Sequence, residues 1–152
     1  MYGRANGISS YGRVANAESN PIQQIVLLYD GAIKFLLMAS ASIQANDIAA
    51  KAEQTDRALQ IINYLQSVLD FERGGDVSVW LNTLYTSVTM IIINASAKLA
   101  ASEMLRAAEL LAPVRDAWDT NARGAMTNPN VSAQPGLAFT SRPEEHRIAF
   151  TS

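Results

Sequence analysis

Apolar residues recur every three or four positions through most of the chain, which predicts a series of amphipathic helices. The first helix is expected to begin after Asn20, because Asn20 is a suitable N-cap, Pro21 fits the first helical position and Gln23 completes a capping box. Helical spacing then continues to a polar break that follows residue 44. The apolar positions of this helix are Ile22, Val26, Tyr29, Ile33, Leu36 and Ile43.

The second helix is predicted from a cap at Asn46 or Asp47 to about Glu72. Adjacent glycines, Gly74 and Gly75, are expected to end it, because glycine adopts the positive φ angles that other residues resist. Its apolar side comprises Ala58, Ile61, Ile62, Leu65, Val68 and Leu69.

The third helix is expected to be capped by Asp76 and is apolar on nearly all sides between Val88 and Leu99. Its predicted buried stripe is Val77, Leu81, Leu84, Val88, Ile91, Ala95 and Leu99, and further large apolar residues fall outside it, namely Trp80, Tyr85, Ile92 and Ile93. One packing neighbour cannot cover such a helix. It therefore lies either deep in a helical assembly or beneath a partner segment.

A turn or kink near Ser102 leads into the fourth helical pattern, formed by Met104, Leu105, Ala108, Leu111, Val114, Ala117 and Trp118. Pro113 falls inside this pattern and predicts a kink or a short interruption near residues 109–112. Four helices joined by short loops predict an all-α fold, an antiparallel up-and-down four-helix bundle over residues 20–123.

The two ends of the chain differ in composition from the bundle. Residues 1–19 are rich in Gly, Ser and Asn and are expected to form a flexible N-terminal arm, with Ile8, Tyr11 and Val14 spaced three apart. Glycines and prolines break every periodicity in residues 124–152, which predicts a flexible tail with an isolated apolar spot at Ile148 and Phe150.

Composition narrows the classes of function. Charged residues make up only 17% of the 152 residues, so more apolar surface than usual is expected, as on a binding protein. The net charge of −2 comes without a basic cluster, which argues against nucleic-acid binding. The chain has no cysteine, no secretion signal and no apolar run approaching a membrane span, so we expect a cytoplasmic protein without membrane insertion.

Few residues suit catalysis. The single histidine, His146, falls in the predicted tail, so neither a metal site nor a bundle-core cofactor finds its usual ligands. Asp116 and Asp119 beside Arg115 are typical of a solvated helix end. We therefore expect no enzyme activity, no cofactor and no metal.

Asp30 and Gly31 are unusual in the middle of an apolar helix, where glycine costs about 1 kcal/mol relative to alanine. Either another helix packs closely over Gly31 with Asp30 in solvent, or Asp30 contacts a bound segment. The large aromatic residues leave a similar choice between core and recognition surface: Tyr29, Trp80, Tyr85 and Trp118.

Three stretches considered together resemble one known family. These are LYDGAI at 28–33, LDFERGGD at 69–76 with Leu84-Tyr85 following, and LL through VRDAW at 110–118. Their order and spacing, and the arm that precedes them, resemble the flagellin export chaperones of the FliS family over roughly residues 1–120. The segment 94–98 has fewer polar and basic residues than the family pattern, and residues from 124 onward have no counterpart in it.

This resemblance implies a cytoplasmic bundle that binds the C-terminal, helix-forming segment of flagellin, blocks premature filament assembly and helps to deliver the subunit to the flagellar type III export gate. The expected contact residues are Tyr29, Asp30, Phe35, Tyr85, Ile92 and Ile93. The resemblance also implies that the arm, through Ile8 and Tyr11 with Val14, covers the binding groove when flagellin is absent.

Two alternatives remain at this point. The surplus apolar surface could be the seam of a homodimer, so that the chain is a monomer or a weak homodimer with a role in assembly. A carrier with a cofactor in the bundle core is the other, although the sequence offers it no ligands.

Overall fold

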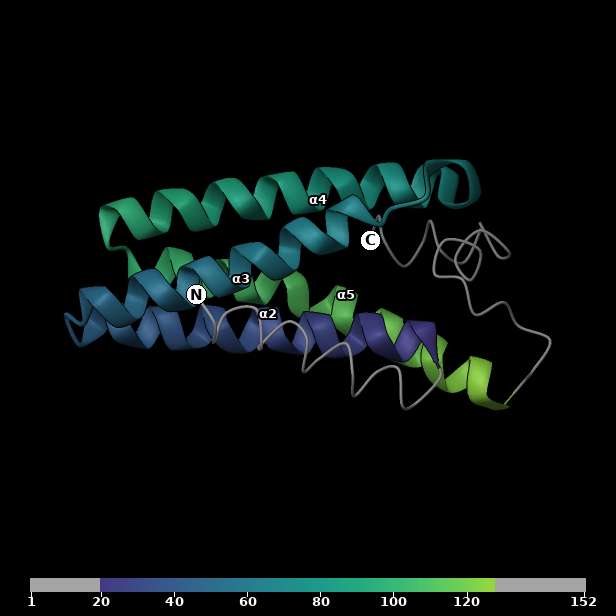
Figure 1. Ribbon diagram of the computed structural model, residues 1–152, viewed down its shortest axis with the longest axis horizontal. Coiled ribbons are helices and arrows are strands. Elements are labelled where there is room, and N and C mark those ends of the chain that lie inside the picture. The colour runs from purple at the N-terminus through teal and green to yellow at the C-terminus, as the bar shows by residue number, and fades with distance from the viewer. Residues whose placement is uncertain (1–19, 128–152) are drawn as a thin grey trace.

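A computed structural model describes residues 20–127, which form four helices and no strand (Figure 1). The helices are α2 (Pro21–Gln44), α3 (Ile48–Ser67), α4 (Phe71–Lys98) and α5 (Ala101–Thr127). Each helix runs antiparallel to the one before it, as Figure 1 shows. The predicted all-α, up-and-down four-helix bundle is confirmed. The predicted arm residues Ile8, Tyr11 and Val14, together with His146 and the apolar spot near the C-terminus, lie outside the described residues.

The start of α2 follows the predicted cap. The Asn20 side chain accepts hydrogen bonds from the backbone N–H groups of Ile22 at 3.0 Å and Gln23 at 3.2 Å. At the next junction Asp47, rather than Asn46, caps α3 by accepting from the Ala50 N–H at 3.1 Å. Asn46 instead adopts a positive φ of 61°, which an asparagine tolerates better than most residues.

The predicted junction between the second and third helices is wrong by several residues. The helix α3 ends at Ser67 rather than near Glu72, and Asp70 rather than Asp76 caps α4, accepting from the Arg73 N–H at 3.0 Å. Gly75 has φ 51° and ψ −125°, so the helical conformation is interrupted there, and a first short helical segment of α4 is joined to its long part through a kink. Both aspartates are competent caps, and only the packing of the chain decides between them.

The buried stripe of α4 is offset by one residue from the predicted one over part of its length. Leu81, Val88 and Ala95 are buried as expected, whereas Tyr85 and Ile92 take the places predicted for Leu84 and Ile91. Both sets satisfy a spacing of three and four residues. Contacts with the other helices, which the sequence does not show, select one set.

The prediction was a kink or a short interruption near residues 109–112, and the interruption is absent because α5 continues through Pro113. Pro113 is exposed on the outer side of α5, where water can satisfy the carbonyl group that loses its hydrogen-bond donor. The helix also passes Arg123 and Gly124 and ends at Thr127. The boundary predicted at residue 123 therefore falls inside α5.

The core lies along α2, which packs most closely against α5 and α3, while α4 packs against α3 and α5. Alanines on facing helices, including Ala32, Ala39, Ala58 and Ala108, are fully or almost fully buried and allow close approach of the backbones. Because α4 packs less closely against its neighbours, a wide strip of its surface faces away from the bundle.

Two of the helices, α2 and α4, are long and apolar enough to cross a membrane by length and composition alone. Core helices of water-soluble bundles meet the same description, and α2 carries Asp30 and Lys34 near its middle. The expectation that no apolar stretch approaches the length of a membrane span is therefore too strong. In the bundle, however, α2 places its apolar side in the core.

Candidate partner-binding surface

Tyr29 and Tyr85 meet in the middle of the bundle. Their hydroxyl oxygens lie 2.6 Å apart and share a hydrogen bond, and the two rings are 6.3 Å apart between centroids. Both side chains are buried, with exposed fractions of 0% and 1%. Burial raises the pKa of each hydroxyl well above its ordinary value, so both stay neutral at physiological pH. The pair joins α2 to α4 across the core.

Ile92 lies two turns along α4 from Tyr85 and is also fully buried. Because a partner cannot touch a side chain that other helices cover completely, Tyr29, Tyr85 and Ile92 cannot be direct contact residues in this conformation. Their side chains hold the core together in this structure, and their contact with flagellin stays a prediction that requires the core to open. The aromatic residue Trp118 is likewise buried, whereas Trp80 is half-buried at the edge of the core.

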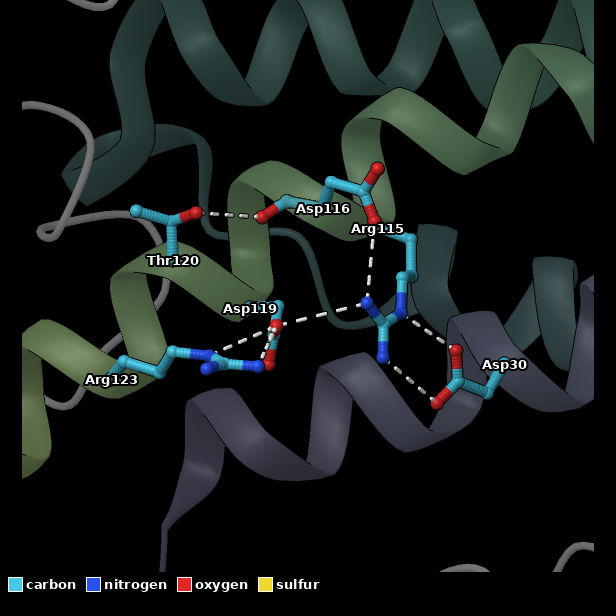
Figure 2. Close-up of polar contacts among 6 residues, drawn as sticks. All are labelled: Asp30, Arg115, Asp116, Asp119, Thr120 and Arg123. Atoms are coloured by element: carbon cyan, nitrogen blue, oxygen red, sulfur yellow. Dashed lines mark hydrogen bonds and ion pairs between the residues drawn. The ribbon is translucent and has the colours of Figure 1, made fainter.

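Asp30 is paired within the chain, and Figure 2 shows its surroundings. The Arg115 guanidinium of α5 donates to the two Asp30 carboxylate oxygens over 2.7 and 3.5 Å. Arg115 also contacts Asp116 at 3.2 Å and Asp119 at 3.7 Å. The hydrogen bond to Asp30 raises the pKa of Arg115. This group, which resembled a solvated helix end in the sequence, ties α5 to α2.

One of the two readings of the Asp30 and Gly31 pair needs revision. Gly31 is buried, as expected for a helix that packs closely against its neighbours. Asp30 is partly exposed and is held by Arg115, so it is not a free charge in solvent, and its contact with a bound segment stays a prediction. Its place is on the α2 and α5 side of the bundle.

Phe35 lies on another side, beneath α3. The Arg57 guanidinium carbon sits 5.6 Å from the centroid of the Phe35 ring, within the range of a cation–π contact. Arg57 also pairs with Glu53 at 3.2 Å. Phe35 is therefore half-buried and partly covered by a charged side chain, which makes it less available to an apolar partner.

Ile93 is the expected contact residue that the structure leaves open, with 46% of its surface exposed. On the same outward side of α4 lie Val79 at 56% and Met90 at 53%. Half-buried Trp80 and Ile91 belong to the same helix. We call Val79, Met90 and Ile93 the outer face of α4.

The outer face of α4 belongs to an unusual stretch. No residue from Val77 to Ala97 carries a charge, although helix surfaces that face water normally do. The expectation from sequence included Ile93 but missed Val79 and Met90. The absence of charged residues over about six turns was the signal that could have identified Val79 and Met90. This signal applies to every side of the helix, so it does not require knowledge of which side is buried.

The six expected contact residues thus do not form one surface. Two meet in the core, one lies beside them, and the remaining three face different sides of the bundle. Over residues 20–124, where side chains are described, the structure shows no group of three or more histidine, cysteine or acidic residues arranged to hold a metal ion.

Comparison with known proteins places the chain in a family. Residues 4–125 match the family described as "Flagellar protein FliS". The chain is 32% identical over 119 residues to the "Flagellar secretion chaperone FliS" of Salmonella typhimurium, with 75% of the chain and 88% of that protein covered. The protein of the same description from Vibrio cholerae is 32% identical over 101 residues, covering 66% of the chain and 74% of that protein. The match reaches from before α2 almost to the end of α5, and the chain therefore belongs to the FliS family of flagellar proteins.

Proposed function

We propose that this protein is a cytoplasmic chaperone of flagellar secretion that binds the C-terminal helical segment of flagellin. By covering that segment it prevents premature filament assembly, and it assists delivery of flagellin to the type III export gate. Membership of the FliS family supports the chaperone role. One observation on this chain supports a helix-binding role: α4 combines an uncharged stretch, residues 77–97, with an exposed apolar outer face.

The outer face of α4 suits an amphipathic helix laid along it. Val79 and Met90 are separated by eleven residues, or about three turns, and Ile93 follows one turn later. Complete burial of a large apolar side chain contributes about 1.5–3 kcal/mol, so these half-exposed residues contribute about 1 kcal/mol each. Micromolar binding needs about 8 kcal/mol. The half-buried residues beside the outer face and the apolar side chains of flagellin must therefore contribute as well.

The proposal is tested by calorimetric titration of the protein with the C-terminal segment of flagellin from the same organism, while circular dichroism follows helix content. We expect one-to-one binding at micromolar affinity or tighter, with a gain in helix as the segment orders. Failure of the folded protein to bind would reject flagellin as the client.

Two neighbouring residues provide a sharp test of the surface. Ile93→Asp places a charge on the outer face of α4 and is expected to weaken binding at least tenfold with little change in unfolding temperature. Ile92→Asp places a charge in the core and is expected to unfold the bundle. Leu105→Asp on α5, where Leu105 is 38% exposed, is the matched control. Normal binding by Ile93→Asp together with loss in Leu105→Asp would move the site to α5.

A homodimer seam on the same face predicts a different result. The mass measured by light scattering would then rise with protein concentration, and Ile93→Asp would abolish that rise. A mass that stays at the monomer value while flagellin binds supports the chaperone function.

The N-terminal arm belongs to the same proposal. Ile8, Tyr11 and Val14 lie within the family match but outside the described residues. We propose that they cover the client surface and leave it when flagellin binds. Hydrogen exchange of residues 1–19 should then increase on addition of flagellin, and unchanged exchange would reject the covering role.

A further inference from the structure

Polar side chains link α3 to α4 at both ends of their contact, beside the apolar residues that both helices place in the core. At one end the Gln66 side chain donates to Asn82 Oδ1 at 2.8 Å and to Thr86 Oγ1 at 3.0 Å. At the other end the Lys51 ammonium donates to the backbone oxygen of Ser96 at 3.3 Å and to its hydroxyl at 3.1 Å. We call this contact the α3–α4 seam. Water can replace such partly exposed hydrogen bonds, so they resist separation of the helices less than apolar packing does.

Two hydroxyl groups are buried without a partner in the same seam. Within residues 20–124, the Oγ1 atoms of Thr55 and Thr89 are inaccessible to solvent and accept or donate no hydrogen bond. Thr55 lies one turn after Lys51 on α3, and Thr89 lies two turns before Ser96 on α4, so both face the seam. A buried hydroxyl without a partner destabilises the closed state, because separation of the helices lets water bind it.

The chain leaves the helical conformation on both sides of the long straight part of α4. Gly75 has φ 51° near its start, and Leu99 has φ 54° immediately after its end. Between these two points the helix can move as a unit, because a change of angle at either end does not break the hydrogen bonds of its interior. Most of the close packing of α2 is against α3 and α5, and α4 meets α2 through the Tyr29–Tyr85 hydrogen bond in the core.

We propose that, in the free protein, α4 separates from α3 along the α3–α4 seam while α2, α3 and α5 stay packed. The opening breaks the Tyr29–Tyr85 hydrogen bond and exposes the buried side of α4, including Leu81, Val88 and Ile92, and so enlarges the apolar surface beyond the outer face. This inference concerns the free protein and does not depend on flagellin being the client.

Hydrogen exchange of the full chain, measured by mass spectrometry over a range of low urea concentrations, tests the opening. Amides of α4 should exchange faster than those of α2 and with a weaker dependence on urea, because a local opening exposes less surface than global unfolding. Equal rates and equal urea dependence in the two helices would overturn the proposal.

Two variants with opposite expected effects test the seam itself. Thr89→Val removes a buried hydroxyl without a large change in shape and should slow exchange in α4 about tenfold, which corresponds to about 1.4 kcal/mol. Gln66→Ala removes the bonds to Asn82 and Thr86 and should accelerate exchange in α4 several-fold. Neither should alter exchange in α2.

Thr120→Val is the matched control, because Thr120 is exposed on α5 and its hydroxyl already donates to the Asp116 backbone oxygen at 3.1 Å. This variant should leave exchange in α4 unchanged. If Thr89→Val and Gln66→Ala also left it unchanged, or shifted α2 and α4 equally, the seam would not be the route of opening and the proposal would fail.

Discussion

The hydroxyl pair of Tyr29 and Tyr85 gives the most direct test of how the core is held together. The two oxygens lie 2.6 Å apart in a site with almost no solvent exposure, so removal of one hydroxyl leaves the other in a dry environment. A buried polar group that loses its partner costs about 1–3 kcal/mol. The side chain of Trp118 also interacts with the Tyr29 hydroxyl, so the two tyrosines are not equivalent.

We expect Tyr85→Phe to lower the free energy of unfolding by about 1 kcal/mol, because the Tyr29 hydroxyl keeps its interaction with Trp118. Tyr29→Phe should lower the free energy of unfolding by about 2 kcal/mol. This change removes the Tyr29 hydroxyl, which is the hydrogen-bond partner of Tyr85 and also interacts with the Trp118 side chain. The double variant leaves neither hydroxyl and should cost less than the sum of the two single changes by about 1 kcal/mol.

Urea denaturation followed by circular dichroism measures these differences. With a slope of about 1–3 kcal/mol per molar urea, a loss of 2 kcal/mol lowers the midpoint by about 1 M. Calorimetry should show that all three variants unfold in one cooperative transition. Strict additivity in the double variant would refute the reasoning, because it would mean that the two hydroxyls do not depend on one another.

Further predictions concern the backbone, the pH dependence and the ion pair. Gly75→Ala should lower stability by about 1–3 kcal/mol despite open space around a Cβ atom there, because its φ of 51° is strained for alanine. Gly124→Ala, also in open space but without a positive φ, should raise stability by up to about 1 kcal/mol, and urea denaturation that gave both changes the same sign would contradict this reasoning. Burial raises the pKa of the two core tyrosines in the folded state. Their contribution to the free energy of unfolding is therefore complete below about pH 10. Above pH 10 the tyrosines of the unfolded chain ionise, and the free energy of unfolding declines by about 1.4 kcal/mol per pH unit for each tyrosine. Urea denaturation between pH 9 and 11 measures this decline, which Tyr85→Phe should make shallower. Asp30→Asn should cost less than about 1 kcal/mol, and the loss should shrink in high salt, because the pair with Arg115 is partly exposed; a larger, salt-independent loss would show that the pair is part of the core.

The sequence predicted local features well where one residue type has one clear physical role. Asn20 before Pro21 identified the start of α2, and the polar break after residue 44 identified its end. It was less reliable where two residues could fill the same role. Asp70 and Asp76 are both good caps, and the glycine pair between them could either end a helix or bend it, so the junction was misplaced.

The same ambiguity explains why several expected contact residues are buried in the structure. Tyr85 and Ile92 are spaced by seven residues, and so are Leu84 and Ile91, so helical periodicity alone cannot say which pair faces the core. Burial assigns the core to the first pair. The pairing of Asp30 with Arg115 joins residues that are 85 positions apart, which no local pattern reveals.

By itself, the sequence determined the class of fold, the number of helices and the presence of an uncharged, apolar third helix that its neighbours could not fully cover. These properties follow from composition and from a period of 3.6 residues, which each segment carries independently of the rest of the chain. Only the tertiary structure decided which side of α4 is exposed, which tyrosines are buried and where the polar α3–α4 seam lies. Those properties depend on how one helix rotates about its axis against another, and that rotation is fixed by the packing of side chains that are distant in the sequence.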